Sequence, residues 1–568
     1  MFAEVLVKAN FGSALTYTIS PKDYPRALVG SLVVVPFGQT TKFGLIIRLS
    51  KKRPPLKTKL KPVVKVLATN WITVESIALT IKISSLTHQP VSNILFKFVP
   101  SLLKKTNMDL PLPSQIRGKF DRYAIYNSLA ERVKTYRNLS QRLTEVNQQV
   151  MIISPQSTHK LIKENLTDLD AVTVTNLNPT QENDVYIKWR KNYVKILIGT
   201  RKIIGWPAAN LGLIVVDDVH NIAHQDEQRP YLDSSTLAWY RVKIEQTKLL
   251  IGASLPSLGL LQREQNKQIK RIKSKPRPPQ IKLIKITSQL LARTTIEALN
   301  KAKTPLIIAP RTGFGGTLSC ISCGWSLTCP KCDGNVNLIE SKSFFNCLNC
   351  QLNQNTPSNC QSCSGHNLRS FGIGVDAIKE ILQKHNINHA TVGTEQALGL
   401  KHDLIVWSFA DSTLLNPNLE RPINFLAQIK EWAGRIPSVV QTLNLESKYW
   451  QILISEKPLY QLLAKRQQKN LPPFRQTLRI ETKDLNKQAS LVNKLKKEGL
   501  DITSSKIVND RAIIELLLDS NQVSLVLAEL SKVTGITIKV DSVINFASQS
   551  AKRRVNANRT YYRSLHSN

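Results

Sequence analysis

The chain has 568 residues and 42% of them are hydrophobic, so it can bury several cores, and its length predicts roughly three to five domains. Lysine and arginine number 78 against 40 aspartates and glutamates, a formal net charge of +38, which favours nucleic acid as a partner. Residues 1–18 hold no apolar core of signal-peptide length, and the longest aliphatic run, 211–216, is too short to span a bilayer. We therefore expect a cytoplasmic protein with no membrane contact.

The first segment, residues 1–106, is rich in β-branched residues and predicts a small β-rich domain. After it come continuous aliphatic runs, which are typical of strands buried on both faces of a parallel sheet. Helical stretches at 128–146 and 374–385 lie between these runs, so we expect two α/β units, 107–280 and 281–455. The runs are residues 150–154, 195–200, 211–217, 248–254, 305–311 and 403–411.

All the cysteines fall within 318–368, inside the second α/β unit, as four C-x2-C pairs. This spacing aims both thiols of a pair at one tetrahedral metal, so the four pairs predict two closed, structural zinc sites. Disulfides are the alternative, but the chain carries neither a secretory signal nor a cysteine elsewhere. The predicted zinc ligands are Cys320, Cys323, Cys329, Cys332, Cys347, Cys350, Cys360 and Cys363.

The last segment, 456–568, predicts a compact α+β domain. From residue 476 onward it reads strand, helix, two strands, helix and strand, which is the split βαβ order. The predicted strands are 477–482, 502–508, 511–518 and 536–540, and the predicted helices are 486–497 and 523–533.

The chain also carries a co-linear series of short motifs. They are Gly-Thr-Arg at 199–201, Asp-Asp-Val-His at 217–220, Gly-Ala-Ser-Leu-Pro-Ser at 252–257, Gly-Thr-Glu at 393–395, Ala-Gly-Arg at 433–435, Leu-Pro-Pro-Phe at 471–474, and the cysteine pairs. Together they resemble the primosomal protein N′ (PriA) family of replication-restart helicases. The resemblance covers nearly the whole chain and implies two RecA-like helicase lobes with a two-zinc insertion. It also implies that 320, 323, 360 and 363 hold one zinc and 329, 332, 347 and 350 the other.

The phosphate-binding loop departs from that family. Gly-x-x-x-x-Gly-Lys-Ser/Thr cradles phosphates with glycine backbone amides and a lysine, but residues 126–133 read Tyr-Asn-Ser-Leu-Ala-Glu-Arg-Val. Arg132 can mimic the charge of the lysine, yet the preceding side chains block close approach, and Val133 cannot ligate Mg²⁺. We therefore expect no nucleotide cofactor at this degenerate loop, and binding of ATP with Mg²⁺ is doubtful.

The remaining ATPase residues are eroded as well. The family has Asp-Glu-Glu-His where this chain has Asp217, Asp218, Val219 and His220, so the water-activating carboxylate is one methylene short. The family has Ala-Gly-Arg twice, whereas here only Arg435 remains and the second arginine is replaced by Ser438. We expect Asp217, Asp218, His220 and Arg435 to be vestigial, with no catalytic role.

The amino-terminal domain resembles the family's module for binding a DNA 3′ end. Tyr17, Gly38 and Lys61 match its motifs and are the candidate DNA contacts, although Gly38 also suits a simple turn and Lys61 a solvated surface. Thr16 stands where the family has an acidic residue, which puts recognition of a free 3′ end in doubt.

These observations lead to one hypothesis with two alternatives. The first is a PriA-like protein that binds forked or branched DNA, or a single-strand/duplex junction, and supports replication restart without unwinding. The resemblance implies primosome or helicase-loading proteins and single-strand-binding protein as partners. The alternatives are an active ATP-dependent 3′–5′ helicase, and a zinc-ribbon adaptor for nucleic acid or protein.

Overall fold

The computed structural model describes residues 1–540, with gaps. The gaps are residues 10–13, 54, 56–58, 88, 101–107, 115–119, 227–231, 275–277, 287–289, 311–316, 321, 324, 326, 328–329, 331–335, 340–343, 348–351, 372–373, 400, 415–420, 509–510, 532 and 534–535. The chain divides into two compact units, one comprising Met1–Ala253 with Gln262–Lys275 and the other Ser254–Leu261 with Pro276–Asp541.

The first unit begins with a six-stranded sheet in the order β2-β1-β4-β3-β5-β6, antiparallel except for the β5–β6 pair. We call this sheet and its helices the N-terminal module. Its last strand lies two residues beyond the predicted boundary at 106, because a short parallel segment pairs with the edge of β5. The elements are β1 (Phe2–Val7), β2 (Leu15–Thr18), β3 (Leu32–Phe37), β4 (Thr40–Ser50), β5 (Lys65–Thr69), α1 (Val74–Thr87), α2 (Val91–Leu95) and β6 (Met108–Asp109).

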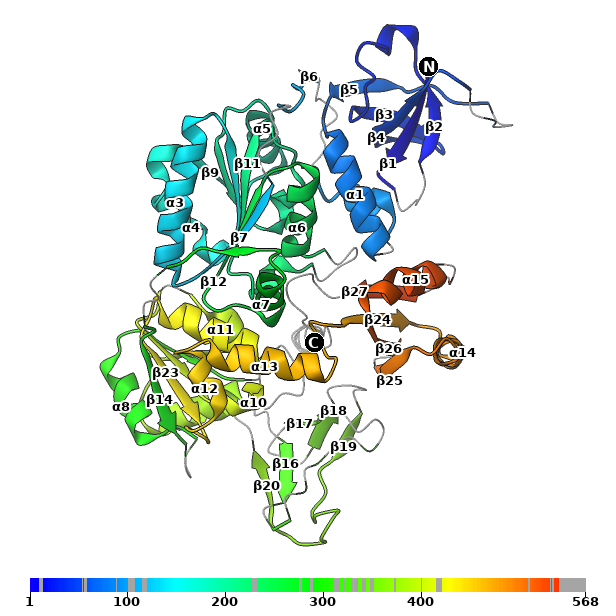
Figure 1. Cartoon of the computed structure of the whole chain (residues 1–568). Helices are drawn as coiled ribbons and strands as arrows, with labels where there is room; N and C mark the ends of the chain where they lie inside the picture. The colour runs from blue at the N-terminus through cyan, green and yellow to red at the C-terminus, as the bar shows by residue number, and fades with distance from the viewer. Residues whose placement is uncertain are drawn as a thin grey trace. The chain divides into compact units, whose positions relative to one another are not determined.

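A seven-stranded parallel sheet follows in the same unit, in the order β13-β7-β12-β11-β8-β10-β9. Figure 1 shows α3 and α6 on opposite sides of this sheet, which explains why its central strands are apolar on both faces. The elements are β7 (Asp121–Tyr126), α3 (Leu129–Glu145), β8 (Gln149–Ile153), α4 (His159–Glu164), β9 (Ala171–Val174), α5 (Pro179–Arg190), β10 (Ile196–Gly199), β11 (Leu211–Asp217), α6 (Ser234–Ile244), β12 (Lys248–Ala253) and β13 (Lys270–Arg271). Between β12 and β13, α7 (Leu258–Gln265) begins in the second unit and ends in the first.

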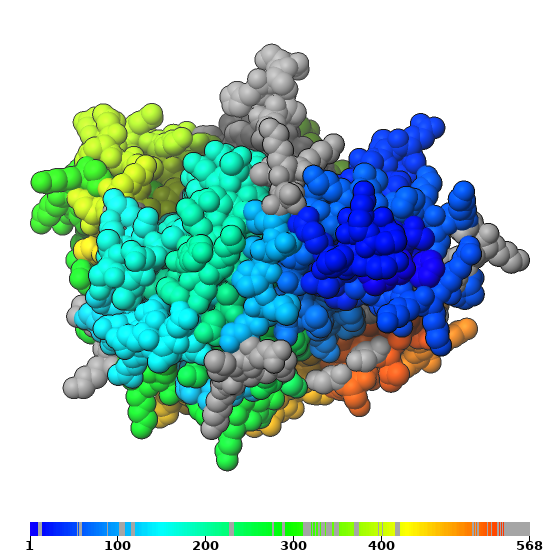
Figure 2. Space-filling model, turned by 90° about the horizontal axis from the view of Figure 1, so that it is seen from above, coloured from blue at the N-terminus to red at the C-terminus, as the bar shows by residue number. Residues whose placement is uncertain are grey.

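Aromatic side chains join the N-terminal module to this sheet layer. The ring of Tyr186 lies 4.8 Å from that of Trp71 and 5.2 Å from that of Trp206, centroid to centroid. The Tyr186 hydroxyl donates to the Trp71 carbonyl, and Arg190 donates to the Asn70 carbonyl at 2.7 Å. In Figure 2 the blue module and the cyan segment form adjoining surfaces of this unit.

The second unit contains a five-stranded parallel sheet in the order β14-β23-β22-β15-β21. Helices cover it and bury an apolar core that includes Trp407, Phe425 and Trp450. The elements are β14 (Ile281–Lys285), α8 (Arg293–Lys301), β15 (Pro305–Ile308), α9 (Val375–Lys384), β21 (Thr391–Gly393), β22 (Leu404–Trp407), α10 (Asp411–Leu414), α11 (Arg421–Ala433), β23 (Ser438–Thr442), α12 (Lys448–Ile452) and α13 (Lys457–Gln468).

Two smaller parts belong to the second unit. The cysteine-rich insertion has an antiparallel pair, β16 (Thr317–Cys320) with β20 (Leu368–Phe371), and a three-stranded sheet of β17 (Val336–Ile339), β18 (Phe344–Cys347) and β19 (Asn353–Asn355). The C-terminal sheet has the order β25-β26-β24-β27 and is antiparallel. Its elements are β24 (Gln476–Thr482), α14 (Leu485–Lys497), β25 (Asp501–Val508), β26 (Arg511–Leu518), α15 (Ser520–Ser531) and β27 (Ile536–Val540).

The structure confirms the mixed α/β class, the parallel sheets and the strand-helix order of the C-terminal segment. Each predicted aliphatic run coincides with a strand to within a few residues at each end. None of the helices in the described part of the chain is long and apolar enough to cross a membrane.

Candidate functional site

The connection from β7 to α3 contains the residues that the sequence resemblance aligns with a phosphate-binding loop. Only Asn127 and Ser128 separate the last strand residue from the first helical one. The amide of Asn127 donates to the Ala253 carbonyl at 3.0 Å, and the amide of Ser128 donates to Asn127 Oδ1 at 2.8 Å. A phosphate cradle needs several amides that face the ligand. This connection is too short to wrap around a phosphate, and both of its amides donate within the protein.

Arg132, on the first turns of α3, points into the protein and contacts Asp217 at the end of β11. Its Nε donates to Asp217 Oδ1 at 2.7 Å, its Nη2 to Asp217 Oδ2 at 3.3 Å, and its Nη1 to the Asn127 carbonyl at 2.7 Å. Both side chains are 0% exposed. Asp217, which the family resemblance implies is a vestigial metal ligand, is therefore held by an internal guanidinium.

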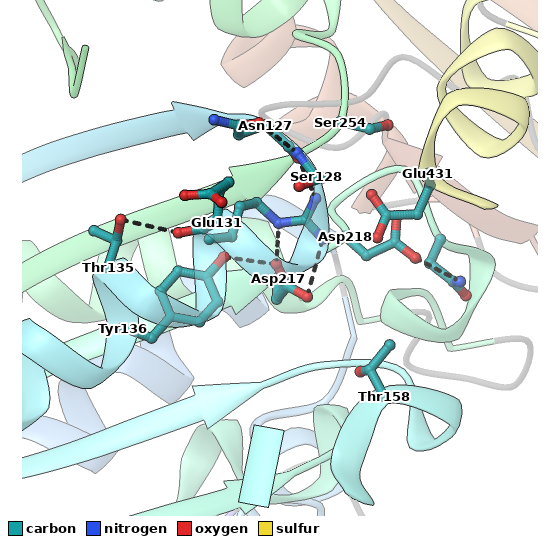
Figure 3. Close-up of polar contacts among 12 residues, drawn as sticks. Asn127, Ser128, Glu131, Thr135, Tyr136, Thr158, Asp217, Asp218, Ser254 and Glu431 are labelled. Carbon is teal, nitrogen blue, oxygen red and sulfur yellow. Dashed lines mark hydrogen bonds and ion pairs between the residues drawn. The ribbon is translucent and has the colours of Figure 1, made fainter. Parts of the chain in front are cut away.

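Tyr136 completes this buried cluster. Its hydroxyl donates to Asp217 Oδ1 at 2.6 Å, and Figure 3 shows its ring beside that carboxylate. Burial, together with the charge of Asp217, raises the pKa of Tyr136 well above its usual value. Gly252 on β12 makes room for it, since a Cβ there would lie 1.8 Å from the Tyr136 hydroxyl oxygen. We call Arg132, Tyr136 and Asp217 the buried ion-pair cluster.

The neighbouring acidic residue is oriented differently. Asp218 has a φ of 53°, in the left-handed region, and its Oδ2 accepts from Asn221 Nδ2 at 3.0 Å. Aspartate tolerates this backbone conformation better than most residues do. His220 follows in the same turn and is half-buried. Figure 3 shows the carboxylate of Asp218 directed away from that of Asp217.

Arg435, which the sequence places in the remnant arginine motif, is also paired internally. Its guanidinium forms an ion pair with Glu431 one turn earlier on α11, and the two side chains are 8% and 1% exposed. The guanidinium carbon lies 4.9 Å from the centre of the Trp432 ring. Ser438, where the family has its second arginine, begins β23 and is 3% exposed.

Nucleotide and Mg²⁺ do not fit these residues. Both oxygens of Asp217 accept hydrogen bonds from buried donors, so a metal ion there would have to displace a guanidinium. Val133 is 1% exposed and packs in the core under α3. The loop therefore lacks the amide cradle that phosphoryl transfer requires, and Val133 stands where the family has its hydroxyl ligand.

The three candidate DNA residues come together in the N-terminal module. Lys61 is exposed and its Nζ lies 3.5 Å from the carbonyl oxygen of Gly38, which forms the β3–β4 turn with a φ of 61°. Thr18 donates its amide to the Lys61 carbonyl at 3.1 Å, which ties β2 to the same place. Tyr17 is only 4% exposed, and its hydroxyl donates to the Pro36 carbonyl at 2.9 Å. Gly38 and Lys61 are therefore accessible, whereas Tyr17 supports the turn from below.

Four of the predicted zinc ligands form a cluster. The sulfurs of Cys320, Cys323, Cys360 and Cys363 all lie within 4.8 Å of one another. Cys320 Sγ is 3.7 Å from Cys363 Sγ, and Cys323 Sγ is 3.5 Å from Cys360 Sγ. A tetrahedral site with zinc–sulfur bonds of about 2.3 Å places its sulfurs roughly 3.8 Å apart, so this donor set fits one Zn²⁺ ion.

The other predicted zinc site lies outside the described residues. Cys329, Cys332 and Cys350 fall in the gaps, and the side chain of Cys347 on β18 is not described either. The second zinc ion therefore stays a prediction. The four described cysteines are free thiols, with no disulfide among them.

Sequence reasoning missed Tyr136 as a member of this region, and it did not connect the glycine of the 252–257 motif with it. Tyr136 lies four residues after Arg132 on α3, so the two share a helix face that points to the sheet. That helical spacing is a signal that could have paired them. Nothing local to either residue indicates Asp217 as the partner, because it lies 85 residues from Arg132.

A profile of the 3'DNA-binding domain (3'BD) of PriA matches residues 4–100. Several curated relatives are named replication restart protein PriA. That of Helicobacter pylori strain J99 is 28% identical over 232 residues, 40% of this chain and 37% of the relative. That of strain 26695 is 26% identical over 305 residues, 52% of this chain and 48% of the relative. That of Borreliella burgdorferi is 22% identical over 391 residues, 61% of this chain and 59% of the relative.

The matched regions therefore cover between 37% and 59% of the length of these relatives. Among solved structures, the DExH-box NTPase HrpB of Escherichia coli matches with a TM-score of 0.30 and 11% identity. That match covers 58% of this chain and 40% of HrpB. A similarity at this level supports no further argument.

Proposed function

The chain is a divergent member of the PriA family, and from that premise we propose that it binds forked or branched DNA in replication restart without unwinding the DNA itself. In this proposal the protein marks the fork, and primosome or helicase-loading proteins and single-strand-binding protein act with it. Their participation rests on the family resemblance alone.

The observation that carries this proposal is the buried ion-pair cluster. Arg132 neutralises Asp217 with two hydrogen bonds, at a position where an ATPase needs the carboxylate for Mg²⁺. Arg435, the remaining candidate for stabilising transition-state charge, is paired with Glu431. Electrostatic stabilisation and metal binding supply most of the rate in phosphoryl transfer. Because both are lost here, the arrangement favours a DNA-binding protein over an ATP-driven helicase.

The N-terminal module supports DNA as the ligand. The accessible residues Gly38 and Lys61 offer a backbone turn and a cation to a phosphate or sugar, and in the proposal Tyr17 positions the turn through Pro36. The net charge of +38 supplies the long-range attraction to the DNA backbone. The zinc sites, one at the four-cysteine cluster and one proposed at the other four cysteines, are structural.

The deciding experiment measures ATP hydrolysis and DNA binding on the same purified chain. We expect no hydrolysis above the blank with forked DNA, in an assay where an active helicase gives a clear signal. We also expect tighter binding to a fork than to linear duplex or RNA, measured by fluorescence anisotropy. DNA-stimulated hydrolysis with strand separation would establish the active 3′–5′ helicase instead. Equal binding of fork, duplex and RNA would favour the zinc-ribbon adaptor.

A charge-matched pair of variants tests the N-terminal contact. Lys61→Gln removes the cation beside Gly38, whereas Lys22→Gln removes another exposed lysine elsewhere in the module. Fork affinity should fall several-fold in the first variant and stay near the parent in the second. Equal affinities of the two variants would argue that Lys61 is a solvated surface residue.

A further inference from the structure

A shallow cavity opens on the N-terminal module, on one face of β3 and β4. Its volume is about 330 Å³, and Thr41 and Phe43 on β4 line it together with Val34 on β3. Val35 packs in the core of the module with Tyr17, and successive strand residues point to opposite faces of a sheet. The cavity therefore lies on the face opposite this core. We call it the Phe43 cavity, and its lining residues are Lys8, Val34, Thr41, Lys42 and Phe43.

The floor of the Phe43 cavity is apolar and partly open. Val34 and Phe43 pair across the two strands and are half-buried, whereas the next pair on the same face, Leu32 and Leu45, is fully buried. The apolar residues of this face thus continue beyond the part that the fold covers. A partly exposed aromatic ring can stack on a planar base. The volume is at the lower limit of small-molecule sites, about 300 Å³, so it suits a single base.

Cations surround this floor. Lys8 donates its amide to the Phe43 carbonyl at 2.8 Å, which places it on one side, and Lys65 on β5 lies across from Val34 on the other. Lys8, Lys42 and Lys65 are exposed, and no acidic side chain in the described part of the chain forms an ion pair with them. The cavity also has no acidic residue in its lining. An apolar floor with a positively charged rim is complementary to a base between two phosphates.

The Phe43 cavity lies close to the candidate DNA contacts described above. Thr41 is three residues from Gly38 along the β3–β4 hairpin, so their Cα atoms are at most about 11 Å apart. Lys61 Nζ in turn lies 3.5 Å from the Gly38 carbonyl oxygen. One extended single strand of DNA can therefore contact both the turn and the cavity.

We propose that the Phe43 cavity binds an unpaired base of single-stranded DNA, with Lys8 and Lys42 at the neighbouring phosphates. Stacking on an aromatic ring accepts any base because every base has a π face, and lysine neutralises a phosphate as a point charge. Duplex DNA keeps its bases stacked inside the helix, so it cannot use the cavity. The inference rests on the proposed function and assigns it a contact for the unpaired arm of a fork.

The test uses two labelled oligonucleotides of equal length, one of thymidines and one with an abasic backbone, and measures their affinity by fluorescence anisotropy. Phe43→Leu removes the aromatic face and keeps an apolar side chain. Phe2→Leu is the matched control, because Phe2 is also half-buried and lies at the opposite end of β4, paired with Ser50. Phe43→Leu should weaken thymidine binding about fivefold or more and leave abasic binding unchanged, since one base–aromatic stack is lost. Equal thymidine affinities of the two variants would overturn the inference.

A second pair of variants tests the cations and decides the matter if circular dichroism shows that Phe43→Leu does not fold. Lys8→Gln with Lys42→Gln removes two exposed charges at the cavity, whereas Lys22→Gln with Lys51→Gln removes two exposed charges away from it. On the thymidine strand, the first pair should make the plot of log affinity against log salt shallower by about 1.4, with the control close to the parent. Equal slopes of the two pairs would overturn the inference.

The remaining outcomes separate this inference from the proposed function. Equal parent affinities for fork, duplex and RNA would refute the proposed function, while a loss of thymidine binding confined to Phe43→Leu would still support the cavity. A parent that binds forks but not the thymidine strand would overturn the inference and leave the proposed function standing. A labelled peptide of alternating aspartate and phenylalanine tests for a protein ligand. If Phe43→Leu weakens binding of this peptide and not of the thymidine strand, the inference is overturned.

Discussion

Replacing Asp217 by Asn should strongly destabilise the first unit. The same replacement of a solvent-exposed metal ligand would have almost no effect on stability. Asparagine keeps the size of the side chain but removes its charge, so the guanidinium of Arg132 becomes a buried cation without a counter-ion. Both side chains are 0% exposed in the parent, which means that water cannot compensate. The stability of this variant therefore distinguishes a carboxylate held in an internal ion pair from a carboxylate that serves as an Mg²⁺ ligand.

The magnitude follows from the burial of the pair. Breaking a fully buried ion pair by removing one partner costs about 3–5 kcal/mol. For a unit of this size that corresponds to a drop in melting temperature of roughly 6–20 °C. Asp218→Asn is the matched control, because Asp218 Oδ2 accepts from a neutral amide at 3.0 Å and asparagine tolerates its left-handed backbone. We expect that control to lose less than about 1.5 kcal/mol.

The stability of both variants is measured in two ways. Circular dichroism follows thermal unfolding, and tryptophan fluorescence follows unfolding in urea. Arg132→Met combined with Asp217→Asn should be less destabilised than the sum of the single changes by about 1–3 kcal/mol, because the uncompensated charge is gone. The reasoning fails if Asp217→Asn has the same melting temperature as Asp218→Asn and the parent. It also fails if Asp217→Asn abolishes a DNA-stimulated ATPase that the parent possesses.

Further predictions concern the metal, the packing and the pH dependence. Elemental analysis should find about two zinc ions per chain and about one in Cys323→Ser; a parent with one or none would contradict the second site. Gly252→Ala should lower stability by about 1–3 kcal/mol, because its Cβ would lie 1.8 Å from the Tyr136 hydroxyl oxygen. Gly399→Ala is the control and should not lower stability, because no described atom outside its two chain neighbours lies closer than 3.9 Å to its Cβ. Equal melting temperatures of the two variants would refute that packing. Burial raises the pKa of Tyr186 above its ordinary value of 10.0, so its contribution to stability is present below pH 10 and is lost as the pH rises further. Unfolding measured between pH 8 and 11 should be less pH-dependent in Tyr186→Phe, and an identical slope would exclude this residue as the cause.

The sequence alone determined where most elements lie. Runs such as 211–217 are apolar throughout because the strand is covered on both faces, and that condition is visible without a fold. The cysteine pairs likewise indicated a metal site, because two thiols three residues apart can bind the same metal ion without any long-range contact. Among the strands of the parallel sheets, β7, β9, β14 and β23 were missed. Polar Asp121 and Arg122 begin β7 and interrupt its apolar pattern. Two lysines interrupt the apolar residues of β14, which lies at the edge of its sheet.

Only the tertiary structure decided what the surviving ATPase residues do. The sequence showed that the glycines and the lysine of the phosphate-binding loop are missing, but it left Arg132 as a possible mimic of that lysine. The structure instead turns Arg132 toward Asp217, because β12 lies between β7 and β11 and the parallel register brings the ends of these strands together. A side chain at the start of α3 then reaches a carboxylate 85 residues away. Such a pairing depends on strand order and register, which no local pattern of residues encodes.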